Sequence, residues 1–456
     1  MATKAALDGK NVGIVITASH NPEYDNGVKL IDSTGDMIDS KWEAYANLIC
    51  NLENNVDAKK FCSNLLTDKS IKKIGSVFIG RDTRSSGSIL LRACKDGIKQ
   101  LGAKPVDYGL VTTPQLHSYV IYSNMFPHIQ QIDIPDFYFS CIKNAFKCIW
   151  GSKPSKKHIL YVDCANGVGA ITLSKLVKPL SNCGLYLKLK NTGEGVLNSM
   201  CGADYVQSEQ KLPHGFENIE NGAHCCSFDG DADRIVFFTK INDKFKLLNG
   251  DKIATLFMLC IREFFDKDIN IGVVQTAYAN GASTKFLKDQ NVDVVYTPTG
   301  VKHLHEQAQK YDIGIYFESN GHGTMLFDPE FSKNFTGRLL AIKTLMNQNV
   351  GDAITNMLLI ETLLRYTKLQ SWVQIYTDMP NVQIKLHVKD KNIINTSSPN
   401  DMQNEINDIV SQYKNARAFV RPSGTENLVR IYCECQNKND LSLLSSKIKL
   451  TVEKYL

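Results

Sequence analysis

The stretch GIVITASHNPEYDNGVKL, residues 13–30, joins an apolar β-branched run to a turn that no regular element can continue. Ile14–Ile16 favours a strand, because β-branched side chains suit a pleated surface. The Asn21-Pro22 pair predicts a turn shortly afterwards. Ser19 is therefore expected at the point where a strand ends in a loop.

The hydroxyl of Ser19 has His20 beside it and Lys29 ten residues further on. A hydroxyl with such neighbours can act as a nucleophile or group carrier, because they can handle its proton and developing charge. The alternative is a plain polar turn, since Ser-His-Asn-Pro is also an ordinary turn sequence. The loops further along the chain decide between the two interpretations.

Length and composition indicate a protein of several domains. A chain of 456 residues is too long for one core, and three or four domains are expected. No apolar run reaches the roughly 18–20 residues of a membrane span, and the first residues lack the core of a signal peptide, so a cytoplasmic protein is expected. The net charge of +5 comes without a long basic run. We therefore expect no nucleic-acid, membrane or protein partner, but a small anion.

The cysteines do not indicate a disulfide framework. There are 13 of them, an odd number scattered over a chain long enough to pack without cross-links. Cys225-Cys226 and Cys433-x-Cys435 lack the C-x-x-C spacing of zinc ligands. Reduced thiols are expected, with no zinc site at these pairs.

The order of predicted strands and helices indicates an α/β fold. Ile159–Val162 and Ile271–Gln275 each run into an Ala-Asn-Gly turn that opens a predicted helix. This weak internal repeat indicates successive domains of one αβ design. The last segment reads instead as a small α+β domain. The expected domains are residues 1–154, 155–262, 263–372 and 373–456.

A polar loop, Gly80–Ser86, follows the predicted strand Val77–Ile79 and precedes a helix. Open α/β sheets bind ligands at such carboxyl ends of strands. Alternatively, Asp82 and Ser86 cap the helix.

Three carboxylates stand at alternate positions in Asp229-Gly230-Asp231-Ala232-Asp233. In a loop they can converge on one hard cation, which would offset their mutual repulsion. An EF-hand is excluded, because its glycine and glutamate positions hold Arg234 and Lys240 here. Three protein oxygens leave room for a phosphate oxygen or water, which suits Mg²⁺ and phosphoryl transfer. The alternative is a solvated acidic turn.

Two further loops carry ligand-binding chemistry. ESNGHGT, residues 318–324, offers a carboxylate, an amide and an imidazole that can hold the hydroxyls of a sugar, or it is a structural turn. Thr299 and Lys302 lie after the preceding strand and can bring a second cation to the same cleft. Arg421-Pro422-Ser423-Gly424-Thr425, with Arg430 after it, forms a predicted anion nest for phosphate; a plain hairpin loop is the alternative.

Together, ITASHNP with DNGVKL, SFDGDADRIV, ESNGHGT and AFVRPSGTENLVRIY resemble the α-D-phosphohexomutase family over nearly the whole chain. The resemblance implies a four-domain phosphohexomutase architecture with three related αβ domains and a C-terminal α+β domain. ESNGHGT is similar to the loop of members that act on N-acetylglucosamine. The implied reaction interconverts N-acetylglucosamine 6-phosphate and 1-phosphate through a 1,6-bisphosphate intermediate, toward UDP-N-acetylglucosamine. The alternatives are a phosphoglucomutase or phosphomannomutase of this family, or a sugar-phosphate-binding relative without catalysis.

The family resemblance also implies roles for single residues. Ser19 is the implied phosphoserine, and its phosphate with Asp229, Asp231 and Asp233 holds Mg²⁺. His20 and Lys29 match positions that contact the reacting phosphate. The implied substrate contacts are Arg234, Thr299, Lys302, Glu318, Ser319, Asn320, His322, Arg421, Pro422, Ser423, Gly424, Thr425 and Arg430. The family's preceding strand and helix, with a Tyr-Gly-Thr-Ala-Gly-Phe-Arg motif, have no counterpart before Ser19, so the first domain is expected to lack a strand.

Overall fold

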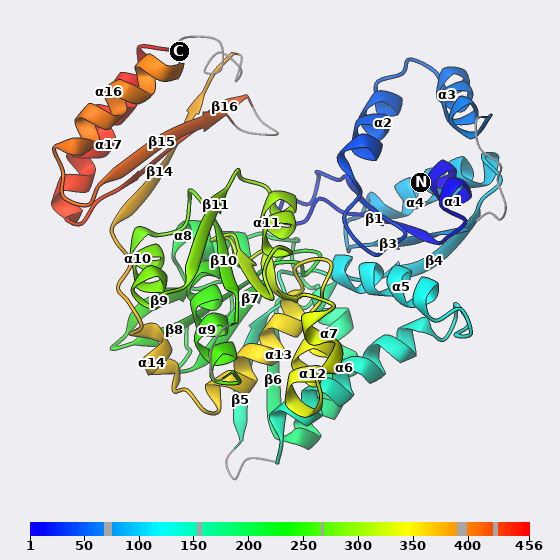
Figure 1. Ribbon diagram of the computed structural model, residues 1–456, viewed down its shortest axis with the longest axis horizontal. Helices are drawn as coiled ribbons and strands as arrows, with labels where there is room; N and C mark the ends of the chain where they lie inside the picture. Colours follow the sequence, from blue (N-terminus) through cyan, green and yellow to red (C-terminus); the bar gives the residue numbers. More distant parts are fainter. Residues whose placement is uncertain (68–74, 153–156, 266–268, 390–398, 423–426) are drawn as a thin grey trace. The chain divides into compact units, whose positions relative to one another are not determined.

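The computed structural model describes the chain except residues 68–74, 153–156, 266–268, 390–398 and 423–426 (Figure 1). The described residues alternate between helices and strands, and the strands form four sheets. The chain divides into two compact units, one of Met1–Thr276 with Val295–Val373 and one of Ala277–Val294 with Gln374–Leu456. The predicted α/β class is confirmed.

The first sheet has the order β2-β1-β3-β4. Its strands are β1 (Val12–Ile16), β2 (Val28–Ile31), β3 (Ser76–Arg81) and β4 (Lys104–Leu110). Its helices are α1 (Ala2–Asp8), α2 (Ser40–Cys50), α3 (Asn55–Thr67), α4 (Gly87–Gln100), α5 (Thr113–Met125) and α6 (Ile134–Trp150). β1, β3 and β4 run parallel, and β1 is buried along its whole length between α5 and the helices α1 and α4. A central strand covered on both faces reads as a continuous apolar run, which is why Ile14–Ile16 predicted it correctly.

The second sheet has the order β6-β5-β7-β8-β9. Its strands are β5 (His158–Asp163), β6 (Leu185–Lys190), β7 (His224–Phe228), β8 (Ile235–Ile241) and β9 (Lys244–Leu248). The helices that follow its strands are α7 (Gly169–Cys183), α8 (Ala203–Glu209) and α9 (Gly250–Arg262). β5 pairs parallel with β6 and β7, whereas β8 runs back antiparallel to β7. The triple-aspartate loop is therefore the short connection between β7 and β8.

The third sheet has the order β11-β10-β12-β13. Its strands are β10 (Ile271–Thr276), β11 (Asp293–Thr297), β12 (Ile313–Phe317) and β13 (Gly323–Phe327). The helices of this part of the chain are α10 (Gly281–Asp289), α11 (Val301–Ala308), η1 (Phe331–Asn334), α12 (Gly337–Leu345), α13 (Ala353–Leu364) and α14 (Leu369–Val373). β10 pairs parallel with β12, and β13 runs antiparallel to β12. The loop of residues 318–322 thus connects β12 to β13, as the β7–β8 loop does in the second sheet.

The two predicted Ala-Asn-Gly turns are present, but their asparagines work differently. Asn280 caps α10 by accepting a hydrogen bond from the N–H of Ala282 (3.0 Å). Asn166 has a left-handed backbone with a φ of 54° and holds another loop instead, accepting from the N–H groups of Gly193 and Gly195 (both 3.1 Å). Both segments therefore repeat a strand followed by a turn, but the asparagine caps a helix in only one of the two.

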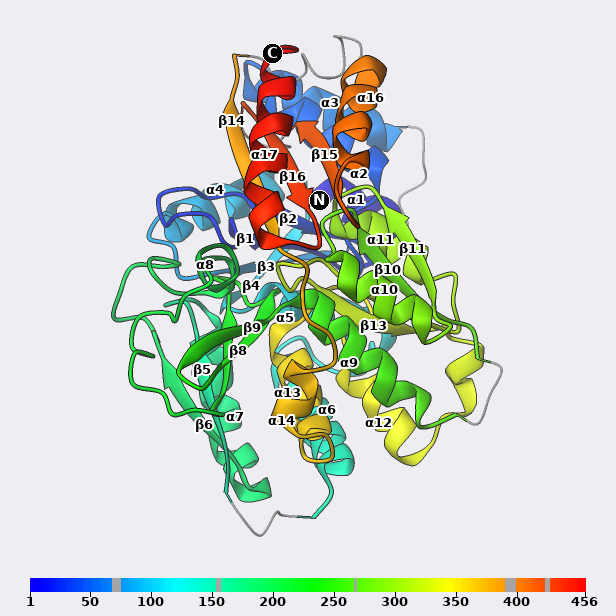
Figure 2. The ribbon, with the colours of Figure 1, turned by 90° about the vertical axis from the view of Figure 1, so that its left-hand side faces the viewer.

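The last sheet lies in the second unit and has the order β14-β16-β15. Its elements are β14 (Asn381–His387), β15 (Arg417–Pro422), β16 (Leu428–Glu434), α16 (Pro399–Ser411) and α17 (Lys438–Glu453). The strands are antiparallel, and both helices cover one face of the sheet (Figure 2). Val429, Ile431 and Cys433 point into the apolar core under these helices. The prediction of a small α+β fold for this segment is confirmed.

Four elements of the first sheet's segment were not predicted, namely α1, α3, β4 and α5. α5 begins at a capping box of Thr112 and Gln115, with Pro114 in its first turn.

No helix among the described residues is long and apolar enough to cross a membrane. The division into four domains at residues 154, 262 and 372 stays a prediction, because the chain separates into the two units above.

Candidate active site

The Ser19 loop leaves the end of β1 and is held by its backbone. Ser19 is buried and has a left-handed backbone with a φ of 48°. Its N–H donates to the hydroxyl of Thr17 (3.0 Å), and its carbonyl accepts from Arg84 Nη2 (3.2 Å) and Asn198 Nδ2 (2.8 Å). Within the part of the chain that the structure describes, nothing hydrogen-bonds to the Ser19 hydroxyl. The loop is fixed while its reactive group stays available.

The loop after β3 supports the Ser19 loop and does not cap the following helix. The Asp82 carboxylate accepts from the N–H of Arg84 (3.0 Å) and the hydroxyl of Thr17 (2.6 Å), and it also pairs with the Arg84 guanidinium. Ser86 makes no side-chain cap and accepts instead from Asn26 Nδ2 (2.9 Å). The capping alternative is therefore wrong for both residues.

Three buried carboxylates converge in the β7–β8 loop. Single oxygens of Asp229, Asp231 and Asp233 lie within 4.8 Å of one another. Asp229 Oδ1 accepts from the N–H groups of Asp233 (3.1 Å) and Arg234 (3.2 Å). One oxygen of each carboxylate, Oδ2 of Asp229 and Oδ1 of the other two, has no hydrogen-bond partner among the described residues. Three orphaned, buried carboxylate oxygens are a donor set that fits a hard divalent cation such as Mg²⁺.

Two side-chain cations face these carboxylates. Lys29 Nζ lies 2.6 Å from Asp231 Oδ2 and 2.5 Å from Asp233 Oδ2, and Arg234 Nε lies 3.8 Å from Asp229 Oδ2. Burial would lower the pKa of Lys29, but the three carboxylates raise it above its usual value. Burial and the neighbouring carboxylates raise the pKa of Asp229 well above its usual value. Two cations against three carboxylates leave a negative charge for a metal to balance.

The structure adds a site residue that could not be identified from the sequence. The hydroxyl of Thr113 donates to Asp231 Oδ2 (2.5 Å), and its N–H donates to the Asp231 carbonyl (3.2 Å). Thr113 follows β4 and opens α5, so it lies at the same carboxyl edge of the first sheet as Ser19. The capping-box spacing of Thr112 and Gln115 was the available signal for a helix start there.

Gly230 brings the Ser19 loop directly against the triple-aspartate loop. A Cβ on Gly230 would lie 2.6 Å from the Ser19 carbonyl oxygen, so only glycine permits this approach. His20 lies beside these loops, and burial together with the charge of Arg234 lowers its pKa to about 4. Its imidazole is therefore neutral near pH 7.

The Glu318–His322 loop also packs against the triple-aspartate loop and the start of β8. Gly321 accepts at its carbonyl from the N–H of Ile235 (3.2 Å), and Glu318 donates its N–H to the His322 carbonyl (2.9 Å). The buried His322 places Nδ1 3.7 Å from Asp233 Oδ2. The structure thus brings together three of the four predicted loops.

Polar groups within this third loop position one another. The Glu318 carboxylate accepts from Asn320 Nδ2 (3.2 Å) and lies 3.4 Å from the N–H of Gly300. The Ser319 hydroxyl donates to the Asp251 carboxylate (3.2 Å), a partner that was not predicted from the sequence. These hydrogen bonds hold a carboxylate, a hydroxyl and an amide in fixed directions.

The contacts of Lys302 and the position of Thr299 do not link these two residues to the triple-aspartate loop. Lys302 Nζ donates to the Ile38 carbonyl (3.0 Å) and to Ser40 Oγ (3.1 Å), and it lies 3.6 Å from the Glu43 carboxylate. These three partners belong to the beginning of α2 and the residues before it, and not to the triple-aspartate loop. Thr299 is exposed just before α11. Both remain predicted substrate contacts.

The fourth predicted loop belongs to the second unit. Arg421 and Arg430 are direct cross-strand partners on β15 and β16, and Lys385 on β14 is the partner of Arg430 on its other side. Arg421 Nε donates to the hydroxyl of Tyr278 (2.8 Å). Such a row of cations suits a phosphate. Pro422 ends β15, whereas Ser423, Gly424 and Thr425 lie outside the described residues.

Comparison with known proteins agrees with this arrangement of loops. Family models match as phosphoacetylglucosamine mutase AMG1 domain II (residues 126–236) and domain III (249–369), phosphoglucomutase/phosphomannomutase alpha/beta/alpha domain I (1–59 and 53–130) and its C-terminal domain (384–449). A phosphoacetylglucosamine mutase of Oryza sativa is 42% identical over 99% of this chain and 89% of its own. The chain belongs to the phosphoacetylglucosamine mutase family. The Homo sapiens member is also 42% identical, over 97% of this chain and 87% of its own.

Solved structures of phosphoacetylglucosamine mutases share this fold. An N-acetylglucosamine-phosphate mutase of the α-D-phosphohexomutase superfamily, crystallised in its substrate complex, matches with a TM-score of 0.91 and 40% identity over 99% of this chain and 91% of its own. The Aspergillus fumigatus enzyme, in complex with GlcNAc-6P and magnesium, matches with a TM-score of 0.91 and 36% identity over 100% of this chain and 91% of its own. The expected phosphohexomutase architecture is confirmed.

Proposed function

We propose that this chain is a phosphomutase that interconverts N-acetylglucosamine 6-phosphate and N-acetylglucosamine 1-phosphate. The observation that carries the proposal is the close approach of the Ser19 loop to a loop of three buried carboxylates with one orphaned oxygen each. Its support from relatives is that the matched enzymes are named for this reaction and that one was crystallised with GlcNAc-6P and magnesium.

Ser19 is the proposed phosphate carrier. As the oxygen of a sugar hydroxyl bonds to phosphorus, the bond from phosphorus to Ser19 Oγ breaks and the proton of that hydroxyl ends on Ser19 Oγ. The products are a 1,6-bisphosphate and an unmodified Ser19. The bisphosphate then reverses its orientation in the site and transfers its other phosphate to Ser19. Lys29 lies where its ammonium can balance charge on the transferred group. His20 stays neutral there and can contact the phosphate as a hydrogen-bonding partner.

Asp229, Asp231 and Asp233 are the proposed magnesium ligands, together with the phosphate on Ser19. Bound Mg²⁺ would supply Lewis-acid stabilisation of the phosphoryl oxygens. The protein's own contribution is to hold the three carboxylates convergent. Thr113 and Lys29 position Asp231 by hydrogen-bonding to its Oδ2, while its Oδ1 has no partner among the described residues.

The Glu318–His322 loop and the Arg421 row are the proposed substrate contacts. Glu318, Ser319 and Asn320 present fixed polar groups to the sugar hydroxyls, with Arg234 and His322 at the base of the same loop. Arg421 and Arg430, with Pro422, Ser423, Gly424 and Thr425 between them in the sequence, are the proposed contacts of the phosphate that does not react. Three further statements remain predictions. The product would serve the synthesis of UDP-N-acetylglucosamine, the protein would be cytoplasmic, and the domain boundaries would lie at residues 154, 262 and 372.

A turnover assay with three hexose phosphates tests the proposal. The purified chain should convert N-acetylglucosamine 6-phosphate with a higher kcat/KM than glucose or mannose 6-phosphate. A preference for either unacetylated sugar would make it a phosphoglucomutase or phosphomannomutase. Binding of all three without turnover would make it a non-catalytic sugar-phosphate-binding protein.

A further inference from the structure

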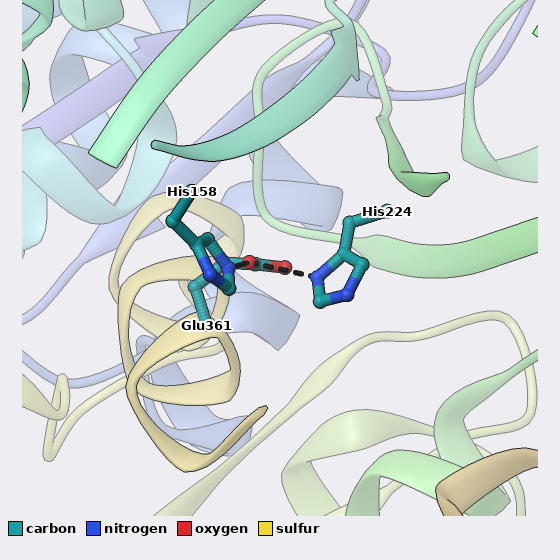
Figure 3. A group of neighbouring side chains, drawn as sticks. All are labelled: His158, His224 and Glu361. Atoms are coloured by element: carbon teal, nitrogen blue, oxygen red, sulfur yellow. Dashed lines mark hydrogen bonds and ion pairs between the residues drawn. The ribbon is translucent and has the colours of Figure 1, made fainter. Parts of the chain in front are cut away.

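A second cluster of metal-ligating side chains lies at the opposite edge of the second sheet. His158 is the first residue of β5 and His224 is the first residue of β7, whereas the triple-aspartate loop follows the far end of β7. Glu361 comes from α13, about 200 positions further along the chain than His158. Figure 3 shows the three side chains turned toward one another.

The sheet register explains why the two imidazoles meet. β5 and β7 are parallel, and His224 is the partner of Leu160, so His158 points to the same face as His224 by the alternation of side chains. The ring centroids are 4.9 Å apart and nearly perpendicular at 89°. His224 Nδ1 lies 3.1 Å from Glu361 Oε2, and His158 Nε2 bonds to the same oxygen.

Hydrogen bonds alone leave part of this cluster unsatisfied. The Glu361 side chain is fully buried, and its Oε1 has no hydrogen-bond partner among the described residues. A buried carboxylate oxygen without a hydrogen-bond partner favours a cation beside it.

We propose that His158, His224 and Glu361 form a zinc site. Two imidazoles and one carboxylate are a donor set that proteins use for Zn²⁺, with a water in the fourth position. Zinc–donor bonds of about 2.1 Å place neighbouring donors of a tetrahedral site about 3.4 Å apart. The three donor atoms here lie within 4.8 Å of one another, so small side-chain adjustments suffice.

The chemistry separates this site from the triple-aspartate site. Imidazole nitrogen suits zinc, whereas an all-oxygen set suits magnesium. The imidazoles keep side-chain exposures of 17% and 19%, which leaves an approach for the ion and its water. A bound zinc would tie the beginnings of β5 and β7 to α13, three segments that are distant in the sequence.

The site can be tested with cobalt as a spectroscopic probe of zinc sites. The full chain, stripped with a chelator and supplied with excess Mg²⁺ to fill the oxygen site, is titrated with Co²⁺ and then with Zn²⁺. We expect one equivalent of Co²⁺ with the visible bands of a four-coordinate ion, no thiolate charge-transfer band, and displacement by Zn²⁺. Absence of these bands would show a hydrogen-bonded ion pair only, and a thiolate band would place the metal on cysteines; either result overturns the proposal.

Variants locate the ion. His158→Ala and His224→Ala should each weaken Co²⁺ binding at least tenfold while Asp231→Asn keeps it. His214→Ala is the matched control, because His214 is an exposed histidine of the same region, and its side chain keeps 73% exposure. Binding that survives in a folded His224→Ala and a folded His158→Ala protein would overturn the assignment. The wild-type titration decides the question even if a variant does not fold.

Discussion

At the scale of single residues, the candidate site depends on which oxygens of the buried carboxylates have hydrogen-bond or ion-pair partners. Asp231 illustrates this, because one of its oxygens binds Lys29 and Thr113 while the other has no partner in the described structure. A carboxylate divided in this way can hold a metal without leaving its supporting contacts. The three aspartates were predicted as metal ligands from their spacing alone, since carboxylates at alternate positions are a local sequence pattern.

Asp231→Asn should weaken the response to magnesium and lower kcat. Removal of one of three anionic ligands reduces metal affinity and the stabilisation of the transferred phosphoryl group. We expect kcat to fall by about tenfold or more, which corresponds to about 1.4 kcal/mol of barrier. Magnesium titrations of turnover provide the measurement, and unchanged magnesium dependence with unchanged kcat would show that the ion binds elsewhere.

Arg421→Ala should raise KM for both monophosphates and lower kcat in both directions. The same clamp must hold the 6-phosphate in one half-reaction and the 1-phosphate in the other, so its loss affects both. Arg421→Lys should restore KM and kcat only partly, because lysine offers a point charge without the bidentate geometry of a guanidinium. Forward and reverse kinetics measure this. Impairment in one direction only, beyond what the overall equilibrium constant allows, would show that the clamp is not shared.

Other residues of the site could not be predicted because their roles depend on tertiary contacts. Arg84 is buried and bonds to the carbonyls of Ser19, Asn21 and Asp25, yet in the sequence it is one arginine of a polar loop. Asn198 reaches the Ser19 carbonyl from 179 positions away. No local spacing indicates either partner.

At the scale of elements, the site is made of loops that leave the ends of buried strands. β1, β7 and β12 each end in one of these loops, and β1 was predicted from its short apolar run. α5 was not predicted, since its residues Thr113–Met125 lack a clear polar face: nine of the thirteen are buried. Periodicity identifies helices with one exposed face and fails for those that are buried on most sides.

Gly321→Ala should disturb the loop between β12 and β13. Gly321 has a φ of +88°, and a Cβ there would lie 1.9 Å from the Ile235 carbonyl oxygen. The backbone must shift, at a cost of about 3 kcal/mol, and the polar groups of the loop should lose their positions, which raises KM. Thermal unfolding and steady-state kinetics test both effects.

The matched control is Gly97→Ala in α4, where a Cβ would meet nothing within 4 Å. It should leave KM unchanged and stabilise the helix slightly. A Gly321→Ala protein as stable and as active as the control would contradict the role given to this loop.

At the scale of the whole molecule, buried polar groups make the stability of the fold depend on pH. His117 of α5 is one of them, because its Nδ1–H donates to the Gly35 carbonyl (2.7 Å) and its ring is buried. Burial lowers the pKa of His117 from its usual 6.5 to about 4. The unfolded chain therefore binds a proton between these pH values that the folded chain does not bind.

Stability should accordingly fall as the pH drops from 7 to 4. A histidine whose folded pKa is lowered destabilises the fold once the pH passes below its unfolded pKa, and about 2.5 pK units correspond to about 3 kcal/mol. His117→Gln removes this proton uptake, so its unfolding midpoint should decline less over the same range than that of the wild type. Parallel pH profiles for the two proteins would refute the account.

The central claim is that Ser19 carries the transferred phosphate, and intact-mass spectrometry with site mapping tests it most directly. After incubation with a hexose 1,6-bisphosphate, the wild-type chain should gain the mass of one phosphate, located on Ser19. Ser19→Ala should gain none, stay folded by circular dichroism and retain less than about a hundredth of the turnover, because loss of the nucleophile costs several kcal/mol of barrier. An active wild-type enzyme with its phosphate on another residue, or an active Ser19→Ala protein, would contradict the account.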